Sequence, residues 1–144
     1  HEQDDARFFG AEFSWQHRLT AHWAFDVNGD LVRAELSNGE PLPRIPPASL
    51  LLGVNYKLNR FDARLTTRLV RAQRQTAANE LESDGHVLVN AGIGYRVPLP
   101  GSELRLNLAA QNLTDQYAVN HVSFLKQAAP LQGRNVQMSM RWEF

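Results

Sequence analysis

The sequence predicts an all-β fold, an antiparallel transmembrane β-barrel segment of about seven strands, from three observations. Apolar and polar residues alternate with a period of two through most of the chain, which is typical of strands with one apolar and one polar face. The segments that connect these stretches are alternately short and long. The aromatic residues of the apolar face lie next to the short segments, as they do at the interfaces of membrane barrels.

The first four predicted strands cover residues 9–16, 23–31, 49–58 and 61–70. On the apolar face of the first two, the larger residues are Phe9, Phe13, Trp15, Trp23, Phe25, Val27 and Leu31. On that of the next two they are Leu50, Leu52, Val54, Tyr56, Leu58, Phe61, Leu65 and Leu69. No charged residue falls on these faces, so each stretch has the pattern of a strand that faces hydrocarbon on one side.

The last three predicted strands cover residues 86–97, 103–111 and 135–144. Their apolar faces carry Val87, Val89, Ile93, Tyr95, Val97, Leu104, Leu106, Leu108, Val136, Met138, Met140, Trp142 and Phe144. Each of the seven stretches is close to the 9–11 residues of a tilted transmembrane strand. Helical periodicity appears nowhere.

The connections favour a membrane barrel over a soluble β-sandwich, which also shows alternation. The stretches 17–21, 59–60 and 98–102 are short, whereas 37–48, 76–85 and 113–133 are long. Outer-membrane barrels have this asymmetry, with tight periplasmic turns and longer outer loops. The prolines in 40–49 and in 98–102 are expected to end strand pairing there.

Composition excludes several classes of protein. The chain has 15 basic and 15 acidic residues, so no net charge recruits nucleic acid, which we do not expect as a partner. Without cysteine, disulfides and thiolate metal sites are excluded. No apolar run approaches the roughly 18 residues of a spanning helix. The sequence begins HEQDDARFFG, which is not a signal segment.

Several motifs carry a family resemblance. They are Asn112, Leu113, Thr114 and Asp115 at the end of one strand, then Pro130, Gly133 and Arg134, and a last strand that closes on Phe144. Together with the opening DDARFFGAE, they resemble the C-terminal part of the barrel of a TonB-dependent outer-membrane receptor. The stretch NHVSFLKQAAPLQGR is most similar to the zinc-uptake branch of that family. The resemblance covers residues 1–144.

The resemblance implies a part of a larger, 22-stranded barrel with a plugged lumen in the Gram-negative outer membrane. The plug domain, the remaining barrel strands and the signal peptide would then lie outside this sequence. The implied partners are outer-membrane lipid, the plug, TonB through the plug, and the barrel-assembly machinery. Trp142 and Phe144 resemble the terminal signal which that machinery reads. A seven-stranded segment with two open edges is not expected to fold stably alone in water.

The function implied is import of a metal ion or metal chelate, with zinc favoured over a siderophore. No permanently bound cofactor is expected; zinc or an iron chelate would be cargo. Two alternatives stay open. One is a passive porin-like or adhesin barrel, and the other is a soluble β-barrel that binds lipid or another small molecule.

Candidate ligand or metal residues lie on the loops and the outer rim. They are His1, Asp4, Asp5, Glu82, Asp84, His86 and His121. None has the spacing of a strong zinc motif, and their convergence around a cation follows only from the topology. His121 and Ser123 could form a base and a nucleophile, but no third group or nucleophile elbow accompanies them, so we do not expect an enzyme.

Charged residues gather on the polar face of the predicted strands. They are Glu12, Asp26, Asp30, Lys57, Asp62, Arg64, Arg68, Arg96, Arg105, Arg141 and Glu143. In a plugged barrel they would pair across strands and with the plug. Arg134 is expected to be structural and to bond loop carbonyls or a neighbouring acid.

Overall fold

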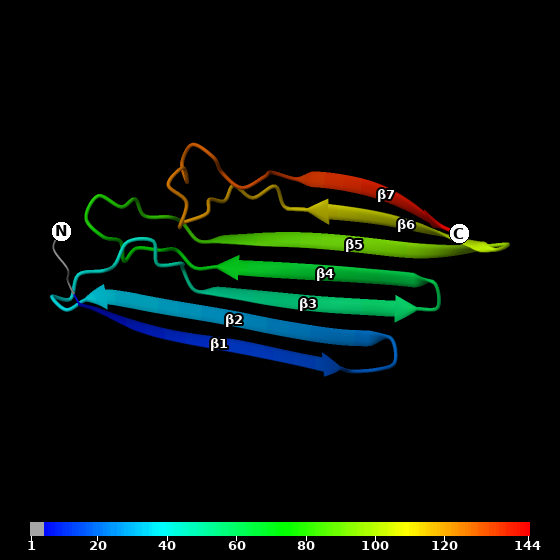
Figure 1. Cartoon of the computed structure of the whole chain (residues 1–144), viewed down its shortest axis with the longest axis horizontal. Helices are drawn as coiled ribbons and strands as arrows, with labels where there is room; N and C mark the ends of the chain where they lie inside the picture. The colour runs from blue at the N-terminus through cyan, green and yellow to red at the C-terminus, as the bar shows by residue number, and fades with distance from the viewer. Residues whose placement is uncertain (1–4) are drawn as a thin grey trace.

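The computed structural model describes residues 5–144, which form a single antiparallel sheet of seven strands (Figure 1). The strands are β1 (Ala6–Arg18), β2 (Trp23–Leu36), β3 (Ser49–Leu58), β4 (Phe61–Val70), β5 (His86–Leu99), β6 (Ser102–Gln111) and β7 (Asn135–Glu143). Each strand pairs only with its neighbours in the chain, in the order β1 to β7. The predicted all-β class and seven antiparallel strands are therefore confirmed.

Several strands extend beyond the ends that the alternation predicted, most of all β1 at its start and β2 at its end. Strand β1 begins at Ala6 and β2 continues to Leu36, because backbone pairing between them runs on to the Ala6–Leu36 pair after the apolar pattern has ended.

The prediction that proline ends pairing at residue 98 is wrong. Pro98 lies within β5 and pairs with Glu103. Strand β4 begins at Phe61, opposite Tyr95, so its ladder does not reach Pro98. Pro98 therefore has only one neighbouring strand, an edge position that tolerates proline.

The two ends of the sheet differ. The connections at residues 19–22, 59–60 and 100–101 are tight turns at one end, whereas 37–48, 71–85 and 112–134 are long loops at the other (Figure 1). The predicted alternation of short and long connections is thus confirmed. Below, these are called the turn end and the loop end.

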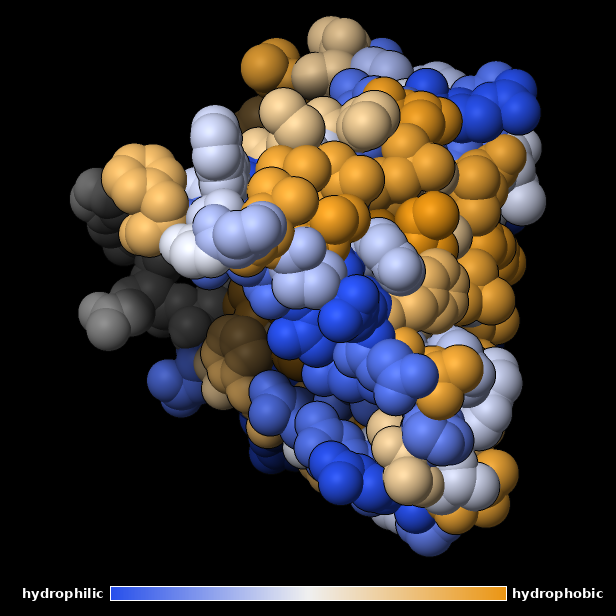
Figure 2. Space-filling view, turned by 90° about the vertical axis from the view of Figure 1, so that its right-hand side faces the viewer, coloured by the Kyte–Doolittle hydropathy of each residue, from blue (hydrophilic) through white to orange (hydrophobic). Residues whose placement is uncertain are grey.

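The two faces of the sheet differ in chemistry. Cross-strand partners such as Val27 and Leu52, or Leu106 and Met140, place the apolar positions on one face. Figure 2, which views the molecule from the turn end, shows hydrophobic residues along one side and hydrophilic residues through the middle. The apolar side chains are not packed inside: Met138 is 72% exposed, and Ala118 is the one buried hydrophobic residue among residues 5–144. The sheet therefore presents its apolar face outward and encloses no hydrophobic core of its own.

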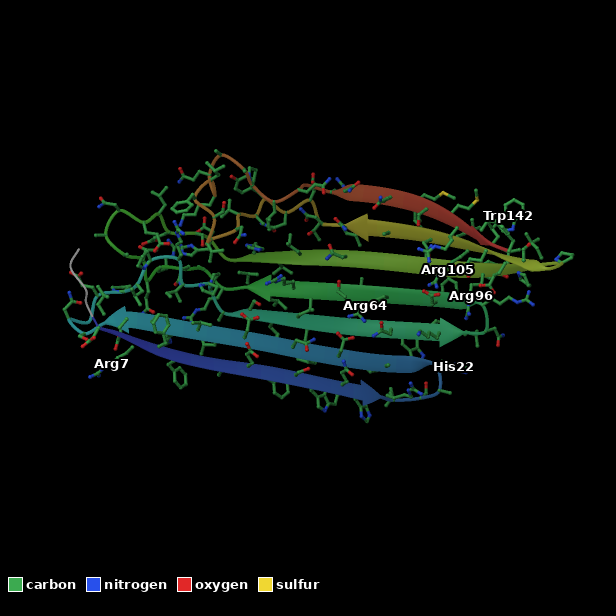
Figure 3. All side chains as sticks on the ribbon, in the orientation of Figure 1. Arg7, His22, Arg64, Arg96, Arg105 and Trp142 are labelled. Atoms are coloured by element: carbon green, nitrogen blue, oxygen red, sulfur yellow. The ribbon has the colours of Figure 1, made fainter. Side chains whose placement is uncertain are left out.

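The aromatic residues beside the turns contact one another. The ring centroids of Trp23 and Tyr56 lie 4.6 Å apart, those of Tyr56 and Phe61 6.3 Å, and those of Trp142 and Phe144 6.3 Å. Figure 3 places Trp142 and His22 at the turn end. These rings form an aromatic rim along the turn end of the apolar face, as an interfacial position requires.

Among residues 5–144, no helix has the length and apolar character needed to cross a membrane.

Candidate functional site

The three long loops lie together at the loop end of the sheet (Figure 1). We call them loop A (residues 37–48), loop B (71–85) and loop C (112–134). Their contacts with one another define the candidate site.

Asn112 closes the base of loop C. Its side-chain nitrogen donates to the carbonyl oxygens of Gln116, at 2.8 Å, and Gln132, at 3.2 Å, and its oxygen accepts from the backbone N–H of Gln116 at 2.9 Å. The residue is 3% exposed and has φ of +48°, a left-handed conformation that asparagine tolerates better than most residues. Asn112 therefore reverses the chain after β6 and joins the two ends of the loop.

The two predicted family motifs meet at this base. The Asp115 carboxylate accepts from the backbone N–H of Arg134 at 2.8 Å, and lies 3.7 Å from its guanidinium. A Cβ on Gly133 would lie 3.2 Å from Asp115 Oδ1, so glycine leaves room for the carboxylate. The backbone N–H of Leu113 donates to Val89 of β5. The motif residues thus fasten loop C to the sheet, and Arg134 pairs with an acid as predicted.

Glu80 joins loop B to loop A and loop C. Its Oε1 accepts from the backbone N–H of Arg44 in loop A at 2.9 Å, and its Oε2 accepts from the N–H of Ala77 at 3.3 Å. From loop C, His121 Nε2 lies 3.3 Å away and Lys126 Nζ 4.0 Å away. The Glu80 side chain is only 11% exposed. One buried carboxylate therefore connects all three loops.

His121 and Lys126 complete this loop clasp, which consists of Arg44, Glu80, Ser83, His121 and Lys126. The hydroxyl of Ser83 lies 2.9 Å from His121 Nδ1, and Lys126 Nζ lies 3.5 Å from the same nitrogen. Lys126 also donates to the carbonyl of Leu81. His121 Nε2 faces Glu80 but is not aligned for a hydrogen bond. The contacts suit a neutral imidazole with the proton on Nε2.

Electrostatics support that protonation state. Burial lowers the pKa of His121 below its usual 6.5, and the Lys126 charge lowers it further, although Glu80 partly opposes both effects. For Glu80, burial acts to raise the pKa, but the amides of Arg44 and Ala77 and the nearby charges outweigh it, so the pKa falls below 4.5. Near neutral pH the clasp therefore holds an ionised Glu80 and a neutral His121.

A cavity of about 660 Å³ opens beside the clasp, between the three loops. Its lining includes Arg44, Glu80, His121, Phe124 and Lys126. The Arg44 guanidinium carbon lies 3.2 Å above the centre of the Phe124 ring, a cation–π contact, while Phe124 stays 82% exposed. The cavity thus combines two cationic side chains, one carboxylate and an exposed aromatic ring.

The structure scatters most of the predicted ligand residues. His1 and Asp4 lie outside the described residues. The backbone carbonyl of Asp5 accepts a hydrogen bond from the Ser37 hydroxyl. Glu82 and Asp84 both pair with Arg74, at 2.6 and 3.1 Å. His86 is the first residue of β5 and lies opposite Val70. Within residues 5–144, no three His, Asp or Glu side chains lie close enough to hold a metal ion.

The proposed pairing of His121 with Ser123 is not formed. His121 is bound by Ser83 of loop B instead, and the Ser123 hydroxyl accepts from the backbone N–H of Leu125. Sequence reasoning missed Arg44, Glu80, Ser83, Phe124 and Lys126. Glu80 and His121 are separated by about 40 residues, and no local pattern marks either as a partner of the other.

The polar face of the sheet carries two similar ion-pair networks. Asp26 of β2 lies over Gly53 of β3, accepts from Asn55 at 2.9 Å, and pairs with Arg64 of β4 at 3.0 Å. Asp62 of β4 in turn lies over Gly94 of β5 and pairs with Arg105 of β6 at 3.5 Å. Figure 3 shows Arg64 near the middle of the sheet and Arg105 toward the turn end. The predicted pairing across strands is present for these residues.

The chain is similar to known proteins both in sequence family and in fold. Residues 2–113 match the family model described as "TonB dependent receptor-like, beta-barrel". Among solved structures, the chain is similar to "Copper transporter OprC", with a TM-score of 0.87 and 23% sequence identity over 97% of this chain. The chain spans 23% of the length of that protein. This second likeness shows a shared fold.

Proposed function

The chain belongs to the TonB-dependent receptor β-barrel family, an outer-membrane family, and from this premise we propose that it forms part of the wall and outer loops of a metal importer. The observation that carries the proposal is the loop clasp with its cavity, beside a sheet whose apolar face carries many exposed large side chains. The wall would separate lipid from lumen, and the loops would capture cargo. The matched copper transporter supports metals as the cargo class.

The surroundings of the cavity favour an anionic metal chelate as cargo, where the sequence favoured zinc. Arg44 and Lys126 bring two positive charges, and Glu80 brings one negative charge. His121 Nδ1 is already engaged by Ser83 and faces the Lys126 ammonium group, which repels a bare cation. Phe124 and Arg44 offer a flat aromatic and guanidinium surface for a planar organic ligand.

Growth of a strain that lacks the whole receptor tests this proposal. Under metal limitation, the strain should fail to use a supplied anionic chelate, and the full receptor should restore growth. Restoration should require TonB, since the family couples to it. Uptake that persists without TonB would instead indicate a passive pore.

A variant of the full receptor tests the cavity itself. Arg44→Gln removes one of the two cavity cations and should raise the chelate concentration for half-maximal uptake about tenfold, as expected for loss of one charge-assisted bond. Arg60→Gln, in a turn at the opposite end, is the matched control and should leave uptake unchanged. Rescue of growth by inorganic zinc alone, equal in both variants, would contradict the chelate proposal and favour the zinc ion.

A further inference from the structure

Three arginines border the apolar face at the loop end. On this face, Arg7 follows Phe9 toward the loop end of β1, Arg33 follows Leu31 on β2, and Arg71 follows Leu69 beyond β4. Each arginine is two residues past the last apolar residue of its row, so it lies roughly 7 Å further along the strand. The backbone N–H of Arg71 bonds Ala48, which continues the β3–β4 ladder by one residue pair.

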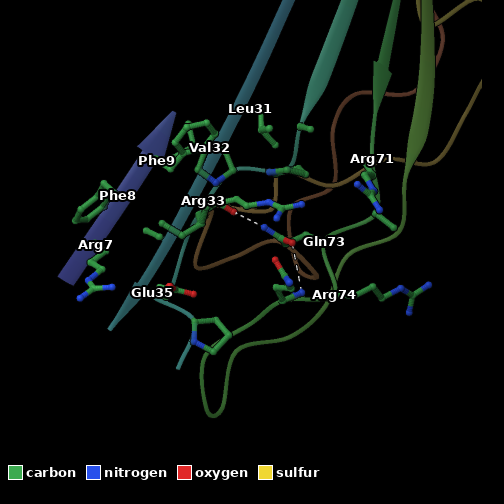
Figure 4. A pocket seen from close by; sticks show the side chains of 18 of the residues that line it. Arg7, Phe8, Phe9, Leu31, Val32, Arg33, Glu35, Arg71, Gln73 and Arg74 are labelled. Carbon is green, nitrogen blue, oxygen red and sulfur yellow. Dashed lines mark hydrogen bonds between the residues drawn. The ribbon is translucent and has the colours of Figure 1, made fainter. Parts of the chain in front are cut away.

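These arginines line one cavity of about 790 Å³, between the extended end of β2, loop A and the start of loop B. Figure 4 shows Arg7, Arg33 and Arg71 in that order across it, with Phe9 and Leu31 beside them. Within residues 5–144, no carboxylate lies within ion-pair distance of any of the three. Glu35, opposite Arg7 in the ladder, is the only acid in the lining, and the fourth arginine there, Arg74, is paired with Glu82 and Asp84.

The two ends of the apolar face therefore differ. At the turn end it finishes in aromatic rings, and at the loop end of β1, β2 and β4 it finishes in guanidinium groups that form no ion pair within residues 5–144. A guanidinium group binds phosphate through two parallel hydrogen bonds, and its position just beyond an apolar band is the level of a lipid headgroup.

We propose that Arg7, Arg33 and Arg71 form a binding site for the phosphate-bearing headgroup of an anionic outer-leaflet lipid. The acyl chains of that lipid would lie along Phe9 and Leu31, the apolar residues next to Arg7 and Arg33 on the same face of β1 and β2. The apolar residues in the lining distinguish a lipid from a free phosphate ion, since only the lipid covers them. The inference rests on the membrane location of the family and is independent of the cargo.

Lipid enrichment around the full receptor tests the site. The receptor is reconstituted in bilayers of phosphatidylglycerol and phosphatidylcholine, and the lipids that stay bound are counted by native mass spectrometry. Wild type should retain phosphatidylglycerol preferentially, and each Arg→Gln change should weaken that preference about fivefold. A triple variant with Arg7→Lys, Arg33→Lys and Arg71→Lys keeps the positive charges but lacks the planar guanidinium groups. It should retain part of the preference.

The matched control removes three arginines elsewhere. Arg18→Gln, Arg60→Gln and Arg96→Gln together cause the same change of charge at the turn end and should leave the preference intact. Wild-type retention by the corresponding Gln triple variant (Arg7→Gln, Arg33→Gln and Arg71→Gln) would overturn the proposal, as would equal loss in the control. Complete displacement of the lipid by inorganic phosphate would also overturn it and indicate a free-anion site. Should the triple variant fail to assemble, Arg33→Gln alone gives the same comparison.

Failure of this site is distinguishable from failure of the proposed transport function. Cargo uptake by the triple variant, measured in the same growth assay, should equal that of wild type. Loss of uptake together with unchanged lipid retention would contradict the lipid proposal while leaving the transport function supported.

Discussion

At the scale of single residues, two glycines on the polar face leave space for the carboxylate of a neighbouring strand. A side chain at Gly53 would occupy the space of the Asp26 carboxylate, and a Cβ at Gly94 would lie 2.8 Å from that of Asp62. Each aspartate therefore lies flat on the next strand and still reaches an arginine on the strand beyond. Because glycine has no side chain, each aspartate–arginine pair can span three strands.

Replacing Gly53 by alanine should destabilise the full receptor by about 1–3 kcal/mol, because the new methyl group must displace Asp26 from Arg64. Denaturant unfolding in detergent measures the change. Gly92→Ala is the control on the same face, where the nearest atom to the new Cβ is 3.9 Å away; its effect should stay within about 0.5 kcal/mol. Equal effects of the two changes would show that the space over Gly53 does not matter.

Asn112→Ala should release the base of loop C. The change removes three hydrogen bonds and leaves alanine in a left-handed conformation, with an expected cost of about 2–4 kcal/mol. Faster hydrogen exchange at Gln116 and nearby amides would report the opening. Asn112→Gly keeps the conformation and loses only the bonds, so its exchange should be intermediate. Wild-type exchange in the alanine variant would be the contrary result.

The sequence predicted some of these residues but not others, for physical reasons. Asn112, Asp115 and Arg134 were found through their resemblance to a family. The structure adds that Asp115 is hydrogen-bonded to both of the others. Glu80 and Lys126 carry no such mark, because their role depends on how three loops meet. A charged loop residue in a sequence is ordinarily solvated. Only the folded structure shows that Lys126 is buried and Glu80 nearly so.

At the scale of elements, the strands followed directly from alternation, whereas their ends did not. Backbone hydrogen bonds do not require apolar side chains, so β1 and β2 extend past the pattern, and a proline at an edge position did not stop β5. The loops show the opposite situation. The sequence correctly predicted that these connections are long, although loop B begins at residue 71 and not at 76. The contacts between loop A, loop B and loop C are long-range and had no periodic signal.

Acidification should loosen the loop clasp. The pKa of His121 is lowered from 6.5, so the neutral form stabilises the folded loops fully above that value and the benefit is lost as the pH falls below it. The pKa of Glu80 is lowered from 4.5, so its contribution is also lost on acidification, at lower pH. The two effects have the same sign, and the loss that is linked to His121 begins at the higher pH because its unfolded-state pKa is the higher of the two.

Spin labels at Gln75 in loop B and Gln127 in loop C can follow this opening in the full receptor. The distance distribution between them should broaden on going from about pH 7.5 to about pH 5.5. His121→Gln lacks the titrating ring and should give a distribution that changes much less over this range. A wild-type distribution that stays constant across the range would refute the pH dependence.

At the scale of the whole molecule, the described sheet is an arc with an exposed apolar face. Strands β1 and β7 each have one neighbour, and large side chains such as Phe13, Met138 and Trp142 are more than half exposed. In water such a surface and such edges favour aggregation. The sequence predicted this from amphipathic strands alone, because the period of two fixes which residues share a face.

The segment of residues 1–144 expressed alone should therefore fail to form a stable monomer in detergent-free buffer. Analytical ultracentrifugation should show large aggregates, and heating should give no cooperative transition. A monomer that melts cooperatively in water would refute this expectation and would favour the soluble β-barrel alternative.

The neighbour-only order of the strands has a consequence for how such walls change over evolutionary time. Each antiparallel pair is connected through one turn or loop and forms no ladder with distant strands. Duplicating or deleting one such pair would alter the circumference of the cylinder while every other ladder kept its partners. The pore diameter can thus change in discrete steps of two strands.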